Sequence, residues 1–167
     1  MIDIFENNYY LIIIINIVIP TFSIEEVKKR ISDAGLKATQ QRIVIYNALL
    51  STVGHPTAEK IFETIRPLNP TISLATVYKT LEALVNINLV SKVSSDQGSL
   101  RYDANLDAHN HIYCTNTKEI IDFEDAELEQ LLSDFFMKKH VSNLMIKDIR
   151  LQINGEKIDL HKEVSIR

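Results

Sequence analysis

The chain has 167 residues, of which 46% are apolar and 24% charged, with a formal net charge of −4. These values are ordinary for a soluble globular protein and exclude wholesale disorder and collagen-like repeats. A single cysteine excludes an internal disulfide and favours a reducing, cytoplasmic setting. Residues 21–90 carry 8 basic and 6 acidic groups and residues 91–167 carry 10 and 14. The division suits an anion-binding module joined to a carboxylate-rich one, although random scatter of surface charge explains it equally well.

The chain begins with an apolar extension, residues 1–20, whose status the sequence leaves open. Its core, residues 9–19, reads YYLIIIINIVI, which is shorter than the roughly 20 residues of a bilayer span. Acidic residues precede it and Pro20 follows, unlike a secretory signal. We interpret the extension as a disordered arm, a β-prone arm that packs on the body or a partner, or upstream sequence from a misassigned start. No function is drawn from it.

Four helices are predicted next, each begun by a side chain that caps its first turn. The first ends near residue 34, the third before Pro67 and the fourth near Asn86. The fourth carries an apolar stripe at helical spacing and a polar, small-residue front. This pattern predicts a helix-turn-helix unit, with an unrelated small helical bundle as the alternative. The capping residues are Ser23, Thr39, Thr57 and Ser73.

A hairpin is predicted after the helices, from residues 89–93 and 100–102 with a turn at 96–98. A helix-turn-helix followed by a hairpin is a winged helix, in which the last helix enters the major groove and the wing contacts the DNA backbone or minor groove. The sequence therefore predicts a DNA-binding domain over residues 21–103.

The remaining chain, residues 104–167, reads as a second domain of mixed helix and strand. We predict strands at 111–114 and 118–123, a helix at 126–140, and a last strand at 145–153 that ends at Asn154-Gly155. Four apolar side chains of the helix are expected to face inward: Leu128, Leu131, Leu132 and Phe135. The predicted fold class is α+β, a winged helix-turn-helix domain followed by an α/β domain.

Three histidines and two aspartates form a candidate metal site. His109 and His111 are two apart at a predicted strand, so both imidazoles point to one face. Asp103 ends the wing, Asp122 lies on the neighbouring strand, and His55 lies between the second and third helices. This set of nitrogen and oxygen donors suits Fe(II) or Mn(II) and is compatible with Zn(II). Taken alone, the histidine pair is also consistent with an ordinary surface pair, and His55 with a turn residue.

Four stretches carry a resemblance to a known family: GLKATQQR at 35–42, HPTAE at 55–59, ISLATVYKTL at 72–81 and HNHIYC at 109–114. From Ser23 to Gly155 the chain resembles the ferric uptake regulator family. The resemblance implies a homodimeric, metal-dependent repressor that binds a double-stranded DNA operator, with residues 104–167 as its dimerisation and metal-sensing domain. It also implies a regulatory metal between the domains, held by His55, Asp103, His109, His111 and Asp122.

The last of these ligands separates branches of the family. An aspartate at position 122 resembles the peroxide-sensing branch, whereas iron-uptake regulators carry glutamate there. The resemblance then implies that peroxide oxidises His55 or His109, the iron leaves and the repressor releases DNA, while Mn(II) occupies the site without this chemistry.

The chain departs from the family at the structural zinc site, which many members build from four cysteines. Here the four positions read Cys114, Thr117, Lys157 and Leu160. One thiolate cannot form such a site, so no structural zinc is expected.

The DNA contacts are expected on the fourth helix and around the start of the second. Tyr78 is expected to contact a thymine methyl and Lys79 a guanine edge. The helix N-terminus, with Ser73 and Thr76, is expected to bind phosphate. Lys37 and Arg42 are expected to meet the DNA backbone, although a solvated surface charge explains Lys37 equally well.

Three alternatives remain at this stage. One is an iron- or zinc-responsive uptake repressor without peroxide chemistry. Another is a non-haem iron enzyme, since two histidines and an aspartate resemble a facial triad, although five protein ligands leave little room for substrate. The third is a metal-free winged-helix interaction domain. No membrane partner is expected.

Overall fold

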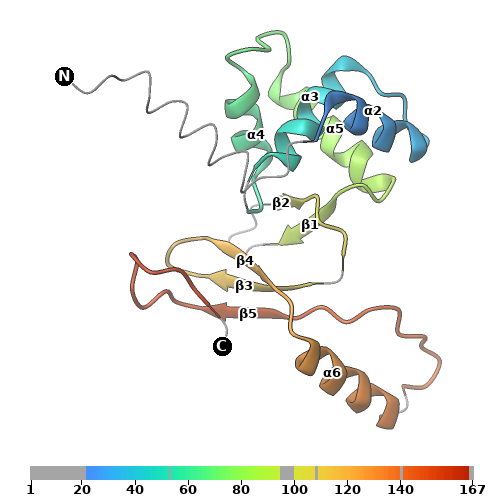
Figure 1. Cartoon of the computed structure of the whole chain (residues 1–167), viewed down its shortest axis with the longest axis vertical. Helices are drawn as coiled ribbons and strands as arrows, with labels where there is room; N and C mark the ends of the chain where they lie inside the picture. Colours follow the sequence, from blue (N-terminus) through green and yellow to red (C-terminus); the bar gives the residue numbers. More distant parts are fainter. Residues whose placement is uncertain (1–21, 53, 95–99, 108, 140, 166–167) are drawn as a thin grey trace. The chain divides into compact units, whose positions relative to one another are not determined.

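The computed structural model describes residues 22–52, 54–94, 100–107, 109–139 and 141–165, and it divides between Leu106 and Asp107 into two compact units (Figure 1). The apolar extension, the hairpin turn at 96–98 and His140 lie outside the described residues. Helices and strands are mixed as the predicted α+β class requires. None of the helices in the described ranges is long and apolar enough to cross a bilayer.

The first unit contains the four predicted helices. Each begins after its predicted capping residue, whose side-chain oxygen accepts a hydrogen bond from the backbone N–H three residues later. This bond satisfies one of the donors that a helix N-terminus leaves unpaired. The helix predictions are confirmed to within one or two residues: α2 Ile24–Asp33, α3 Gln40–Leu50, α4 Ala58–Ile65 and α5 Leu74–Asn86.

The core of the first unit lies between these helices. The apolar stripe of α5 is buried, with Val77, Leu81 and Leu84 at 0% exposure. It packs in one cluster with side chains from the other three helices, among them Ile31, Ile45 and Ile61. Burying each such side chain contributes about 1.5–3 kcal/mol to the free energy of folding. Because the apolar stripe faces the core, the opposite, polar face of α5 is left for other contacts.

The wing follows as an antiparallel pair, β1 Ser91–Ser94 and β2 Leu100–Asp103, in which Ser91 lies opposite Asp103. It begins two residues later than predicted. Asn88 has a φ of 55°, and the N–H of Leu89 donates to the carbonyl of Leu84, so residues 88–90 end α5 instead of starting the strand. The order of helices and hairpin is that of a winged helix.

The second unit contains a three-stranded sheet in the order β4-β3-β5 (Figure 1). The antiparallel pair β3 Asn110–Cys114 and β4 Ile120–Phe123 was predicted, but β4 begins later because Lys118, with a φ of 63°, belongs to the turn. β5 Gln152–Gly155 runs parallel to β3.

The prediction of a last strand over 145–153 was wrong at both ends. Gln152 lies opposite His111 in the parallel register, so residues before 151 would face chain that precedes Asn110 and lies outside their partner strand β3. A strand needs such a partner for its backbone groups. At the other end, Asn154 and Gly155 pair with β3 and belong to the strand instead of ending it.

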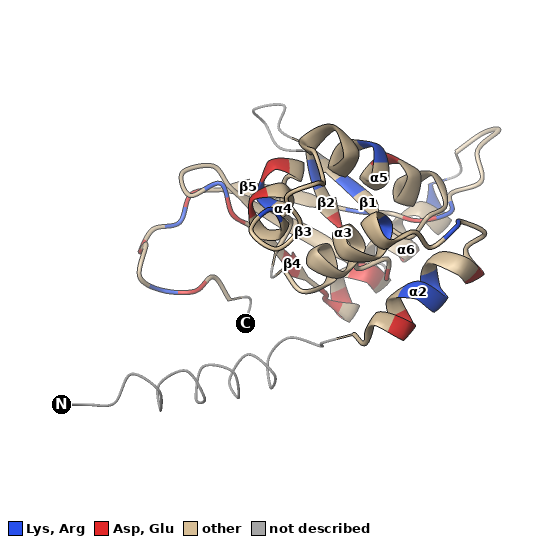
Figure 2. Cartoon of the chain, turned by 90° about the horizontal axis from the view of Figure 1, so that it is seen from above, with Lys and Arg blue, Asp and Glu red and all other residues tan. Residues whose placement is uncertain are grey.

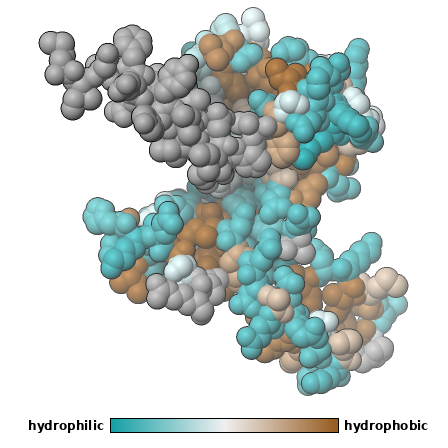
Figure 3. All heavy atoms as spheres, in the orientation of Figure 1, coloured by the Kyte–Doolittle hydropathy of each residue, from teal (hydrophilic) through white to brown (hydrophobic). Residues whose placement is uncertain are grey.

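Helix α6, Ala126–Lys138, has no buried residue. The prediction that Leu131 and Phe135 face inward was wrong, because their side chains are 61% and 50% exposed. Leu132 and Phe136, one turn apart on a neighbouring face, instead turn toward the segment 141–149. Figure 3 shows hydrophobic side chains at the surface of this part of the second unit.

Candidate metal centre

In the first unit, His55 and Asp103 form a buried donor pair. Their Nε2 and Oδ2 atoms are 3.5 Å apart, although 48 positions separate the residues in sequence. The other oxygen of Asp103, Oδ1, accepts a hydrogen bond from the backbone N–H of Asn105 at 2.7 Å. This bond fixes the carboxylate, so Oδ2 is directed to the imidazole.

The segment around His55 is attached to the wing. The N–H of Tyr102 donates to the carbonyl of Pro56 at 3.0 Å, and Thr57 forms an isolated β-bridge with Arg101. The Arg101 guanidinium donates through Nη1 to the carbonyl of His55 at 2.9 Å. Strand β2 therefore holds both donors, Asp103 as its own last residue and His55 through the attached segment.

In the second unit, His109, His111 and Asp122 converge. His111 and Asp122 lie opposite each other in the register of β3 and β4. The Nε2 atoms of the two imidazoles are 3.0 Å apart. Oδ1 of Asp122 lies 3.7 Å from Nε2 of His109 and 3.5 Å from Nε2 of His111. Sheet pairing thus brings His111 and Asp122 together, and His109, the residue just before β3, adds the third donor atom.

A hydrogen bond orients His109 for this role. Its Nδ1 lies 2.7 Å from the carbonyl oxygen of Asp107. A carbonyl only accepts, so this nitrogen carries the proton and donates. In the neutral ring the lone pair is then on Nε2, the atom that faces the neighbouring donors, and outer partners orient metal-ligating imidazoles in this way.

The donor separations in both units fit a metal ion. A metal–nitrogen distance of about 2.1 Å puts adjacent ligand atoms about 3.0 Å apart in octahedral and about 3.4 Å apart in tetrahedral geometry. The observed separations are 3.0–3.7 Å in the second unit and 3.5 Å in the first. Imidazole and carboxylate donors suit Fe(II), Mn(II) and Zn(II). The set therefore has both the spacing and the chemistry for such an ion.

The structural zinc of the family does not fit this chain, because Cys114 is the sole thiol and is buried. Hydrogen bonds connect the same region instead. The side chain of Asn116 donates to the carbonyl of Lys157 at 2.9 Å and accepts from its N–H at 3.0 Å. Lys157 Nζ lies 3.2 Å from the carboxylate of Glu119. The Thr117 hydroxyl and then Lys157 hold the pKa of Glu119 below its usual value.

The residues predicted to contact DNA lie at the start of α5 and around the start of α3. The Ser73 hydroxyl accepts from the N–H of Thr76 at 3.1 Å and lies 2.9 Å from its hydroxyl. Arg42 Nη1 donates to the carbonyl of Lys37 at 2.8 Å, so this guanidinium has a local partner as well. Lys79 lies on α5 beside Tyr78. These residues lie in the winged-helix unit, and their contact with DNA stays a prediction.

Sequence reasoning missed Glu59 as a partner of Tyr78. The Tyr78 hydroxyl donates to the Glu59 carboxylate. This bond raises the pKa of Tyr78 and lowers that of Glu59. Glu59 stands in the HPTAE stretch at 55–59, so the motif marked the residue, but not its contact with α5. Arg101 was missed too, since nothing in its spacing indicates the carbonyl of His55.

Charge in the first unit is partly paired. Figure 2 shows basic and acidic residues together along the ribbon of α2. Lys28 lies within ion-pair distance of Glu25 and Lys29 of Asp33. The excess of basic groups over residues 21–90 is therefore not concentrated on this helix.

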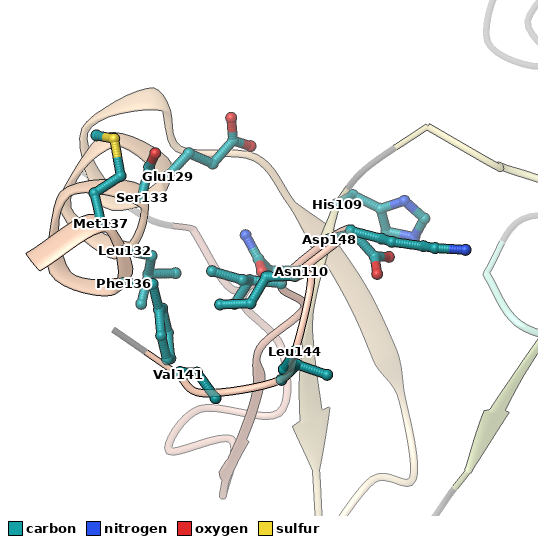
Figure 4. Close-up of a pocket in the computed structure, with 13 residues that line it drawn as sticks. His109, Asn110, Glu129, Leu132, Ser133, Phe136, Met137, Val141, Leu144 and Asp148 are labelled. Carbon is teal, nitrogen blue, oxygen red and sulfur yellow. The ribbon is translucent and has the colours of Figure 1, made fainter. Parts of the chain in front are cut away.

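A cavity of about 570 Å³ lies within the second unit, between α6 and the segment 141–149 (Figure 4). Leu132, Phe136 and Val141 line one side of it, and Asn110 at the start of β3 and the preceding His109 also line it. The sequence did not predict the cavity, because it depends on the irregular path of residues 141–151.

Comparison with known proteins gives consistent matches. Residues 33–154 match the model of the Ferric uptake regulator family. The peroxide-responsive repressor PerR of Staphylococcus epidermidis is 32% identical over 132 residues, which are 79% of this chain and 86% of that protein.

Two solved structures resemble the fold over most of the chain. The Vibrio cholerae ferric uptake regulator is 26% identical with a TM-score of 0.67, over 78% of this chain and 98% of that one. The Campylobacter jejuni peroxide stress regulator is 25% identical with a TM-score of 0.61, over 83% and 98%. Proteins of this kind are transcriptional regulators and not enzymes, and on these matches the chain belongs to the ferric uptake regulator family.

Proposed function

We propose that the chain is a metal-dependent repressor of transcription that senses peroxide. The observation that carries this proposal is the convergence of two imidazoles and the Asp122 carboxylate within 3.7 Å in the second unit. The similarity to peroxide-responsive repressors supports the same conclusion. The single cysteine is consistent with action in the cytoplasm, where the DNA operator would be found.

A single Fe(II) or Mn(II) ion is proposed to bind both donor groups, His55 and Asp103 from the first unit and His109, His111 and Asp122 from the second. Binding the ion would hold the winged helix at one angle to the rest of the chain. In a homodimer, that angle sets the spacing of two α5 helices, and one spacing fits two operator half-sites. Binding of the metal would then strengthen binding of DNA, and the reverse, by a coupling free energy of about 1–3 kcal/mol.

At the operator, α5 is proposed to lie in the major groove with Tyr78 against a thymine methyl and Lys79 at a guanine edge. Ser73 and Thr76, at the N-terminus of this helix, would bind phosphate. Lys37 and Arg42 would contact the backbone. The Tyr78 hydroxyl already donates to Glu59, which leaves the ring for apolar contact.

The homodimer is proposed to form through the second unit. Leu131, Phe135 and Met137 on α6 are half or more exposed, and Ile153 on β5 is 46% exposed. Exposed apolar side chains of this kind are typical of surfaces that a partner covers.

Peroxide sensing is proposed to act on His55 and His109. Bound Fe(II) would supply the redox chemistry that Mn(II) does not. One oxygen atom of peroxide is inserted at a ring carbon of the histidine and the other leaves as water, so the ring loses two electrons and peroxide gains two. The oxidised ring is a poorer ligand, and the two donor groups separate.

The Mn(II)-loaded protein is first used to select a DNA duplex from a random pool. The test then measures binding of this duplex by protein loaded with Fe(II), Mn(II) or Zn(II), before and after peroxide is added. We expect peroxide to abolish binding of the Fe(II) form and to add 16 Da, the mass of one oxygen atom, to a peptide with His55 or His109. The Mn(II) form is the control and keeps binding. If peroxide abolishes DNA binding without adding oxygen to a histidine, or does not abolish binding, the result would favour an iron- or zinc-responsive repressor.

A further inference from the structure

The short segment that carries His55 is attached to strand β2. Gly54, with a φ of 80°, turns the chain just before His55, a conformation that glycine adopts at low cost. Pro56 follows and has no N–H to donate. Three attachments join the segment to strand β2: the bond from Tyr102 to Pro56, the bridge of Thr57 to Arg101, and the bond from Arg101 to the carbonyl of His55.

One of these attachments, the bond from Arg101, comes from a side chain. It spans 46 positions in sequence, is partly buried and measures 2.9 Å. The acceptor belongs to the ligand residue itself, so the guanidinium acts on the backbone of His55 while the imidazole faces Asp103 at 3.5 Å.

We propose that Arg101 is a positioning residue for the metal: it fastens His55 to the wing strand that ends in Asp103, and so keeps the donor pair of the first unit assembled. This inference rests on the proposed metal function and adds a residue that is not itself a ligand. Outer partners of metal ligands commonly change metal affinity about 10- to 100-fold.

The proposal gives the wing a direct role in sensing. Strand β2 pairs with β1 in the wing and also holds both metal donors of its unit. Metal bound by His55 and Asp103 therefore stiffens the wing strand within the DNA-binding unit. By linkage, a wing held on DNA favours metal binding to the same extent.

Positioning and charge predict opposite effects of removing Arg101. A positive side chain repels a nearby cation, so Arg101→Gln would tighten Mn(II) binding if charge alone mattered. If Arg101 positions His55, the same variant binds Mn(II) more weakly. Lys92→Gln is the matched control: it removes a positive charge from β1, where Lys92 pairs with Glu82 and lies opposite Tyr102.

The experiment measures Mn(II) affinity of the full chain by the electron paramagnetic resonance of free Mn(II), with the metal-free thermal midpoint as a second readout. We expect a loss of about 10- to 100-fold for Arg101→Gln, no change for Lys92→Gln, and equal metal-free midpoints. Hydrogen exchange at the Tyr102 amide, which donates to Pro56, should slow when Mn(II) is added to the wild type.

Equal or tighter Mn(II) binding by Arg101→Gln overturns the proposal. If that variant does not fold, the Mn(II) affinity of Arg101→Lys is the test. This substitution keeps the charge but loses the guanidinium geometry, so weaker binding supports positioning and wild-type affinity overturns it. Absence of Mn(II) binding in the wild type would instead overturn the proposed metal function.

Discussion

The two units of the chain differ in how they use their apolar residues. The winged-helix unit buries the inner faces of α2, α3, α4 and α5 in one cluster. In the second unit, α6 has no buried residue and its apolar side chains remain exposed. The first unit thus has a buried core of its own, whereas the second has apolar surface that a second copy of the chain is proposed to cover.

The two donor groups differ in the same way. In the second unit, His109 and His111 are two residues apart and Asp122 follows from the register of a hairpin, so local pairing assembles the group. In the first unit, His55 and Asp103 come together because a loop is attached to the wing. We therefore expect the second unit to bind metal first and the first unit to convert that binding into a response.

The largest expected effect tests the contrast between the cores. Leu81→Ala on α5 removes a side chain with 0% exposure and should lower the free energy of unfolding by about 2–5 kcal/mol. Leu131→Ala on α6 should change the unfolding of the monomer by about 0.5 kcal/mol or less. Urea unfolding at low protein concentration measures both. Similar losses in the two variants would mean that α6 packs as tightly as α5.

Removing a ligand from the second unit should affect metal binding most. Asp122→Ala should weaken Mn(II) binding by more than about 100-fold, beyond the effect of an outer partner. Glu124→Ala, two residues further on and exposed, is the control and should leave affinity unchanged. Titration with Mn(II) separates the two, and unchanged affinity in Asp122→Ala would remove the carboxylate from the ligand set.

Removing His55 should separate binding from response. In His55→Ala the second unit retains its three donors, so Mn(II) still binds, with lower affinity. The coupling of about 1–3 kcal/mol between metal and DNA should be lost. DNA affinity with and without Mn(II) measures this coupling. If Mn(II) still raises DNA affinity to the wild-type extent, the first unit takes no part in sensing.

The smallest expected effect is a pH dependence at Glu59. Its pKa is lowered chiefly by the hydrogen bond from Tyr78. A lowered pKa in the folded state adds stability above the ordinary value of 4.5, and this stability is lost as the pH falls through the folded value. Solvent screening limits the effect to about 0.5 kcal/mol or less. Glu59→Gln should show a shallower loss of stability below pH 4.5 than Glu63→Gln, its neighbour on α4.

Local signals made most of the fold predictable. The caps at Ser23 and Thr57 act through bonds within three residues, and the spacing of Val77, Leu81 and Leu84 directly indicates a buried face. The pair His109 and His111 was predictable from a spacing of two residues at the start of a strand, although His109 itself lies just before β3.

The prediction errors arose where contacts with residues distant in sequence determine the structure. Alternating apolar residues over 145–153 predicted a strand, but the extent of β3 limited β5 to four residues. Leu131 and Leu132 are both apolar, and only the position of residues 141–149 determines which of them is covered. Arg101 gave no sequence signal, because its acceptor is a backbone carbonyl 46 positions away.

The most direct measurement is anomalous diffraction at the manganese edge from crystals of the Mn(II)-loaded chain. The account predicts one Mn(II) ion per chain that is bound by the imidazoles of residues 55, 109 and 111 and by the carboxylates of 103 and 122. An ion bound by the second unit alone, with His55 and Asp103 beyond coordination distance, would contradict it.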